Sequence, residues 1–155
     1  MSGFVASPPA QIPDTIIVGD GWWPSLSIAA FRDAVKIPRV VTDVRVREAI
    51  AAGMMDVAHQ LRSWRGEKEV AGATSLEQVE SPTYGGEKEA VMLWRRAVFA
   101  FAAAELADTH NDISATDGGR ERTAARAASA DEHRRNATQA IRAMKGRGRN
   151  RVALR

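Results

Sequence analysis

The sequence contains no cysteine, and this absence excludes several kinds of site at once. A disulfide framework, a thiolate-ligated zinc, an iron–sulfur cluster and a cysteine nucleophile all need that residue. The composition therefore fits a reducing compartment. With 155 residues, of which 45% are hydrophobic, the chain is long enough for one domain with its own core and needs no covalent staple.

Long apolar runs are also missing. The longest one, residues 97–104, is far shorter than the roughly 20 residues that a membrane-spanning helix needs. The amino terminus has no basic stretch followed by an apolar run, and Pro8, Pro9 and Pro13 would interrupt one. We therefore expect neither an export signal nor a membrane partner.

The last of the six prolines is Pro82, so the 73 residues after it contain none. Residues 1–24, in which proline and glycine are frequent, are predicted to form an extended N-terminal arm with a strand-like patch at 16–18. Residues 146–155 are predicted to form an extended basic C-terminal tail. The helical domain would then occupy residues 25–145.

Hydrophobic periodicity predicts about four helices in this domain. The first begins after Pro24, with Ser25 or Ser27 as its cap, and stops before Pro38. The second follows a Thr42 cap. Its apolar positions recur every three or four residues, as expected of a helix with one buried face: Val46, Ile50, Met54, Val57, Leu61 and Trp64.

Glycines are expected to end the later helices. Gly66 ends the second helix, and a connection of about 20 residues, longer than most, leads to a third helix over 87–109. A fourth, rich in alanine and arginine, covers 120–145. Nothing in the sequence indicates a set of strands that could build a sheet, so we predict an all-α fold.

The net charge is only +3, but it is unevenly distributed. Residues 67–116 carry four Lys or Arg against nine Asp or Glu, whereas residues 117–155 carry eleven against four. An acidic middle and a basic end suit either a polyanionic partner or subunits that pack acidic face to basic face.

Signals for catalysis are weak. The three histidines, His59, His110 and His133, include no pair at the i, i+4 spacing that directs two imidazoles at one metal. Neither a phosphate-binding glycine loop nor a Gly-x-Ser-x-Gly nucleophile motif is present. We therefore expect no catalytic, metal-binding or cofactor-binding residues, and a hydrolase is the least favoured class.

The C-terminal tail offers three interpretations. Arg147, Arg149 and Arg151, with no acidic residue after position 144, are typical of a polycation that binds phosphates. Alternatively, Val152 and Leu154 point one way in an edge strand that a partner's sheet accepts. The third interpretation is a solvated terminus.

The adjacent Trp22 and Trp23 also leave two possibilities open. Tryptophans next to a proline either close the domain as part of its core or anchor it in another chain. Packing in the core is the commoner role of such a pair.

Several short motifs, in the same order, resemble the head completion/stabilisation family of tailed bacteriophages. They extend over about residues 15–154 and comprise Gly21-Trp22-Trp23-Pro24-Ser25-Leu26, Phe31-Arg32-Asp33-Ala34, Val41-Thr42-Asp43, Arg47, Ser63-Trp64-Arg65, Arg96-Ala97-Val98-Phe99-Ala100-Phe101-Ala102, Ala140-Ile141-Arg142 and Gly146-Arg147. Each motif is weak alone, and the series is fairly specific.

The resemblance implies a structural head-to-tail adaptor. Such a protein binds the portal ring after DNA packaging, stabilises the filled head and presents a surface to the tail connector. It implies neighbouring copies in a twelve-fold ring, the head-tail neck of the virion as location, and assembly in the host cytoplasm. The candidate partner-binding residues are those of the tryptophan pair and the tail, and some arginines would face packaged DNA in the channel.

A free nucleic-acid-binding module that acts through the Arg-rich tail is the alternative. It would bind DNA in isolation, with strong salt dependence. We rank it second, because proteins that grip single strands interleave aromatic side chains with their cations, and the nearest aromatic residue to the tail is Phe101.

Overall fold

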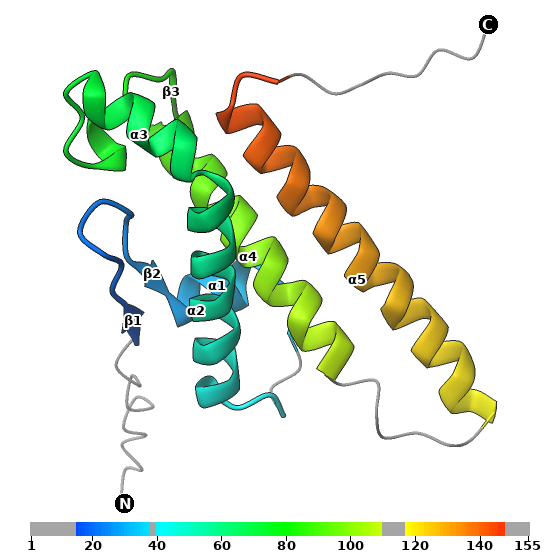
Figure 1. Ribbon diagram of the computed structural model, residues 1–155. Helices are drawn as coiled ribbons and strands as arrows, with labels where there is room; N and C mark the ends of the chain where they lie inside the picture. The colour runs from blue at the N-terminus through cyan, green and yellow to red at the C-terminus, as the bar shows by residue number, and fades with distance from the viewer. Residues whose placement is uncertain (1–14, 38–39, 110–116, 148–155) are drawn as a thin grey trace, which may run out of the picture.

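The computed structural model describes residues 15–37, 40–109 and 117–147, with backbone alone for 117–128 (Figure 1). The described part is mostly helical, as the sequence predicts. Its helices are α1 (Ile28–Ala34), α2 (Asp43–Gln60), α3 (Arg62–Val70), α4 (Glu89–Thr109) and α5 (Asp117–Met144). Two short antiparallel ribbons accompany them, β1 (Ile16–Ile17) with β2 (Leu26–Ser27) and β3 (Thr83–Tyr84) with β4 (Glu87–Lys88).

Helices α2, α4 and α5 form an up-down-up layer with α4 in the middle (Figure 1). The short α1 and the first ribbon lie against α4 and α2. Helix α5 packs mainly along α4, so most of its circumference has no neighbour among the described residues. The wide apolar arc of α4 in the sequence is explained by this central position.

Local capping signals decide where the first two helices begin. Ser27 Oγ accepts a hydrogen bond from the backbone N–H of Ala30 at 3.0 Å, which selects Ser27 rather than Ser25 as the cap of α1. Thr42 Oγ1 accepts from the backbone N–H of Arg45 at 3.5 Å and caps α2. Both caps satisfy N–H groups that have no partner inside the helix.

The prediction that one helix runs to Gly66 is wrong. Helix α2 ends at Gln60, and the fully buried Leu61 forms a turn before α3 begins. Gly66 lies inside α3, where it has a right-handed conformation and costs only about 1 kcal/mol relative to alanine. Gly72, with a φ of +99°, ends α3, because only glycine adopts this conformation without strain.

The predicted connection between the second and third helices is partly ordered. After α3 come one turn of 3-10 helix, η1 (Leu76–Gln78), and the β3–β4 hairpin. Gly85 and Gly86 form the hairpin turn with φ values of +57° and +83°. Two consecutive residues with positive φ are what a two-residue hairpin loop of type I′ requires.

The last two helices match the prediction within three residues at each end. The glycines at 118 and 119 are exceptions, since they lie inside the first turn of α5 rather than before it. Gly146, at φ +68°, ends α5 as predicted. The backbone N–H of Arg147 then donates to Arg142 O at 2.8 Å, and that of Gly146 donates to Ala143 O at 2.9 Å.

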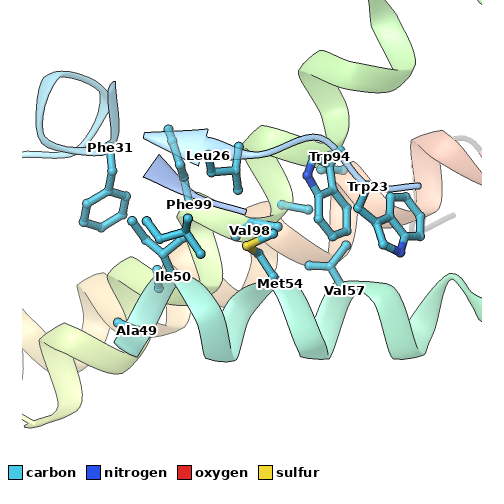
Figure 2. Close-up of a cluster of buried hydrophobic side chains, with 14 of the residues drawn as sticks. Trp23, Leu26, Phe31, Ala49, Ile50, Met54, Val57, Trp94, Val98 and Phe99 are labelled. Carbon is cyan, nitrogen blue, oxygen red and sulfur yellow. The ribbon is translucent and has the colours of Figure 1, made fainter. Parts of the chain in front are cut away.

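The core lies between the N-terminal ribbon, α1, α2 and α4 (Figure 2). The indole of Trp23 stacks on that of Trp94, with ring centroids 4.2 Å apart and planes within 10°. Phe31 meets Phe99 edge to face, with centroids 5.2 Å apart. These two aromatic pairs attach the N-terminal segment and α1 to α4.

Small residues let the long helices approach closely. On α2, a Cβ added to Gly53 would lie 2.8 Å from the carbonyl oxygen of Val98 on α4. On α5, the described buried side chains are mainly small ones: Ala130, Ala137, Ala140, Ile141 and Met144. The fourth segment, which has little of its own to bury, is therefore held by contact with the alanines of α4.

This geometry predicts opposite effects for two glycine-to-alanine substitutions. Gly53→Ala should lower the free energy of unfolding by about 1–3 kcal/mol, because the methyl group forces α2 away from α4. Gly66→Ala, where an added Cβ meets nothing within 4 Å, should raise it by about 0.5–1 kcal/mol. Urea unfolding of both variants measures the difference, and equal effects would contradict the close helix crossing.

Candidate interaction surfaces

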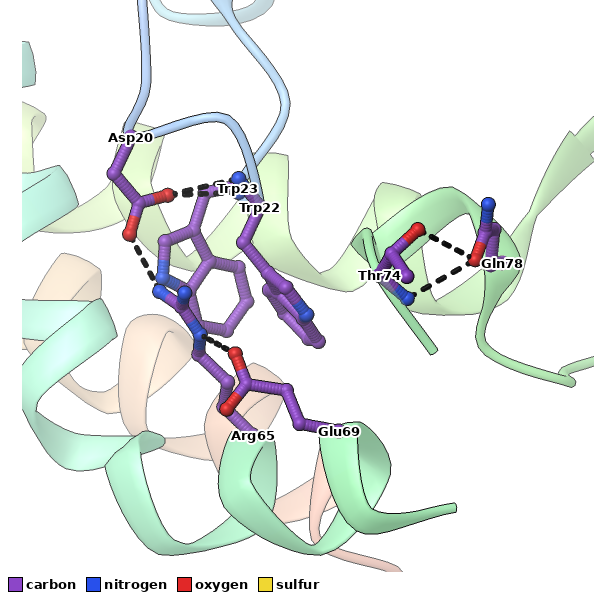
Figure 3. Close-up of polar contacts among 7 residues, drawn as sticks. All are labelled: Asp20, Trp22, Trp23, Arg65, Glu69, Thr74 and Gln78. Atoms are coloured by element: carbon purple, nitrogen blue, oxygen red, sulfur yellow. Dashed lines mark hydrogen bonds and ion pairs between the residues drawn. The ribbon is translucent and has the colours of Figure 1, made fainter. Parts of the chain in front are cut away.

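The structure places Trp22 and Trp23 in the core, 4% and 5% exposed. Their backbone N–H groups both donate to Oδ1 of Asp20 at 3.1 Å, which holds the chain in a tight corner (Figure 3). The carbonyl oxygen of Trp22 accepts from the backbone N–H of Leu76 at 2.9 Å. This is the packing alternative; a direct role of the pair in partner binding stays a prediction.

Arg65 on α3 closes this corner, and sequence reasoning gave it no role there. Its guanidinium donates to Asp20 Oδ2 at 2.5 Å and to Glu69 Oε1 at 2.7 Å, and it lies 5.0 Å from the ring centroid of Trp22. The acid just before the two tryptophans is a local signal for such a turn. Arg65 is 45 residues away, so no local pattern connects the two.

The hydrogen bonds of this corner lower the pKa of the Asp20 carboxyl group. Partial burial alone would raise the pKa of Asp20, but hydrogen bonds from Arg65 and from the backbone of Trp23 and Trp22 outweigh it and hold the pKa below its ordinary value. The charged form therefore stabilises the fold at neutral pH. This contribution is lost as the pH falls through the lowered pKa.

A basic surface lies at the C-terminal end of α5. Lys145 and Arg147 are both exposed there, so the first of the predicted tail cations faces solvent. The other predicted tail residues, Arg149, Arg151, Val152 and Leu154, lie outside the described residues.

An acidic surface lies on α2 and the C-terminal half of α4. Burial and the nearby carboxylates of Asp56 and Glu48 raise the pKa of Glu105, in that order of cause. An ion pair between Asp108 and Arg134 shows that this end of α4 lies beside the middle of α5. Arg134 precedes Lys145 by eleven residues, so about 16 Å of helix separates this end of α4 from the basic end of α5.

The described residues contain no group of three or more His, Asp or Glu side chains placed to hold a metal ion. His59 is exposed, with its ring nitrogen 3.3 Å from the guanidinium of Arg62. His133 lines a surface groove on α5, and His110 lies outside the described residues. No helix in the described ranges is both long and apolar enough to span a bilayer.

The corner predicts a pH-dependent stability defect. Asp20→Asn should lower the free energy of unfolding at pH 7 by about 1 kcal/mol, because a charged acceptor for Arg65 is lost. Unfolded aspartate has a pKa of about 3.9, so the gap between variant and wild type should close as the pH falls from 5 to 2. Denaturant unfolding across this range measures it.

A control variant tests whether the effect belongs to the corner. Asp33 is exposed on α1, and Asp33→Asn should change stability little at any pH in this range. A loss for Asp20→Asn that is the same at pH 7 and pH 2, or equal losses for the two variants, would contradict the ion-paired corner.

Comparison with known proteins places this helical layer in a family. The sequence profile of the family described as phage head completion protein (GPL) matches residues 17–154. The head completion/stabilization protein of Escherichia phage P2 is 27% identical over 147 residues, which are 95% of this chain and 87% of the relative. The probable head completion/stabilization protein of Haemophilus phage HP1 is 29% identical over 144 residues, covering 91% and 93%.

No solved structure matches the chain. The family match begins at Ile17 in β1 and includes the five described helices and nearly the whole basic tail. The chain belongs to the phage head completion protein family.

Proposed function

We propose that this protein is a structural head-to-tail adaptor. It binds the portal ring after DNA packaging, stabilises the filled head and presents a docking surface to the tail connector. In this proposal it acts in the head-tail neck of the virion and assembles in the host cytoplasm. The observation that carries the proposal is the family match over residues 17–154, together with two relatives named for head completion or stabilization.

The separation of charge supports a ring of copies. The acidic surface of Glu48, Asp56 and Glu105 and the basic end of α5 are two different surfaces of one subunit. A subunit with two different complementary surfaces makes head-to-tail contacts, and such contacts close into a ring when the rotation between copies permits. A twelve-fold ring would match the portal on which it assembles.

The basic tail is the proposed portal-binding or DNA-facing element. Arg147 is exposed directly after the end of α5, so the described start of the tail presents its charge to solvent. Arg149 and Arg151 would continue this charge towards acidic groups of the portal or phosphates in the channel. Val152 and Leu154 would add an apolar contact with the same partner.

The two tryptophans contribute indirectly in this proposal. They shape the corner that joins the first ribbon to α3 and η1, and the partner meets the polar surface built over them. We do not propose the alternative of a free nucleic-acid-binding module, because both relatives are named for head completion or stabilization.

Complementation of filled heads assembled without this protein tests the proposal. Wild-type protein should protect the packaged DNA from nuclease and allow tails to join. Changing Arg147, Arg149 and Arg151 to alanine should raise the concentration needed by at least about tenfold, because losing two or three charged contacts removes about 1.4 kcal/mol or more.

A control variant tests whether the effect belongs to the tail. Arg62 is exposed on α3, away from the tail, and changing it to alanine should leave protection and tail joining close to wild type. Failure of the wild-type protein to protect heads would contradict the adaptor. Equal activity of the tail variant and wild type would remove the proposed role of the tail.

A further inference from the structure

The side of α2 that faces away from the core exposes two large apolar side chains. Val44 and Met55 are 70% and 68% exposed, although the opposite side of the same helix is buried. They are eleven residues apart, which is about three helical turns, so they lie on one line along the helix. Ala51 and Ala52, both partly buried, lie between them. We call this line of four side chains the outer face of α2.

Acidic side chains border the outer face of α2. Glu48 and Asp56 are exposed one turn before and one turn after Ala52. Burial and the charges of these two carboxylates raise the pKa of Glu105 on α4, so the three acids lie close enough to interact. None of the three forms an ion pair with another residue in the described ranges. The surface therefore favours a partner that brings a cation together with aliphatic groups.

Helix α5 offers such a partner on the side that faces away from α4, which we call the outer face of α5. Arg135 and Thr138 are exposed there, and Arg135 forms no ion pair among the described residues. Asp131 lies on the same side but is already paired with Arg134, at 3.0 Å. The aliphatic stem of an arginine can cover apolar side chains while its guanidinium reaches a carboxylate. The outer faces of α2 and α5 are therefore complementary in charge and polarity.

The order of the helices places these two outer faces at opposite edges of the layer. Helices α2 and α5 lie on either side of α4 and run in the same direction (Figure 1). A ring repeats one subunit around its axis, and each subunit shows a different surface to each neighbour. When the layers lie side by side, α5 of one copy meets α2 of the next and points the same way.

Contacts with α4 show which parts of the two helices are at the same height. A Cβ added to Gly53 of α2 would meet Val98 of α4. The next residue of α4, Phe99, lines the same surface hollow as Asn136 of α5. Gly53 and Asn136 are therefore about level with each other on either side of α4.

This alignment puts Arg135 level with Ala52, because each is one residue earlier in its helix. Glu48 and Asp56 are then about one turn, or roughly 6 Å, below and above that point. The guanidinium of the next copy can reach between the two carboxylates, and the small side chain of Ala52 leaves room for it.

A second pair of charges favours the parallel direction. In this alignment Arg47 of one copy is only about two residues, or roughly 3 Å, in height from Glu132 of the other. Both side chains are exposed. If one helix were reversed about Ala52, the same two residues would be about 12 Å apart in height.

We propose that the outer face of α2 binds the outer face of α5 of the next copy, in the parallel direction, with Arg135 between Glu48 and Asp56. The apolar side chain of Met55 is then covered by α5. The inference rests on the proposed ring, and it narrows the basic partner of the acidic surface to the middle of α5.

Cysteine crosslinking on DNA-filled, tail-less heads tests this contact, and the chain has no natural cysteine that interferes. In the contact pair, Met55→Cys with Thr138→Cys, the two positions are level between neighbouring copies. In the control pair, Val44→Cys with Thr138→Cys, the α2 position is equally exposed but about 16 Å further along the helix. The contact pair should form covalent multimers at least about tenfold faster, because docking holds its thiols at a high effective concentration.

Charge reversal gives a second measurement on the same heads. Arg135→Glu should raise the protein concentration needed to occupy the heads by at least about tenfold, because it places like charges together. Adding Glu48→Lys and Asp56→Lys to the same chain should restore binding, since each contact in the ring regains opposite charges. Arg96→Glu, at an exposed position on α4 outside both outer faces, should bind like wild type.

The outcomes separate this contact from the adaptor function. Heads that retain no wild-type protein would contradict the adaptor function and, with it, the contact. If the wild-type protein binds, the α2–α5 contact alone is overturned by equal crosslinking rates of the two pairs, by normal binding of Arg135→Glu, or by failure of the compensating lysines to restore binding.

Discussion

The rest of this structure depends on helix α4, which packs against α2 on one side and α5 on the other. Both contacts need small residues: Gly53 lets α2 approach the backbone of α4, and alanines form most of the contact with α5. Because α4 is apolar around most of its circumference, it is stable only with neighbours on several sides. The layer and the core both follow from this requirement.

The N-terminal region is also held in place by packing against α4. Trp23 stacks on Trp94 of α4, and the corner that presents it is held by Asp20 and Arg65. The core packing and the Asp20–Arg65 corner do not use the side chains of the acidic surface on α2 and α4 or of the basic end of α5. Both surfaces therefore stay exposed to solvent. A subunit of this kind has a rigid interior and two different ends, which suits assembly with copies and partners.

Local signals in the sequence predicted much of this fold. The caps at Ser27 and Thr42, and the end of α5 at Gly146, depend on neighbouring residues alone. The apolar stripe continues through Leu61 and hides the turn there, and the sequence predicts only a long connection where the β3–β4 hairpin lies. The turn at Leu61 and the β3–β4 hairpin depend on contacts that bring the chain back to α4. Hydrophobic periodicity within one segment carries no information about those contacts.

The candidate surfaces were less accessible to sequence reasoning. The Asp20–Arg65 pair joins positions far apart in the chain, and the outer faces of α2 and α5 lie at opposite edges only because α4 packs between them. Charge counting predicts an acidic segment at 67–116 and a basic end, but Glu48 and Asp56 of the acidic surface lie outside that segment. The family resemblance was identifiable from ordered short motifs, and the comparisons confirm it.

The most direct test of the adaptor account is to incubate the purified protein with tail-less, DNA-filled heads and image the portal vertex by electron cryomicroscopy. The account predicts additional density with the symmetry of the portal, in which the basic end of α5 can be located. A bare portal vertex, together with salt-sensitive binding of the same protein to free DNA, would contradict it.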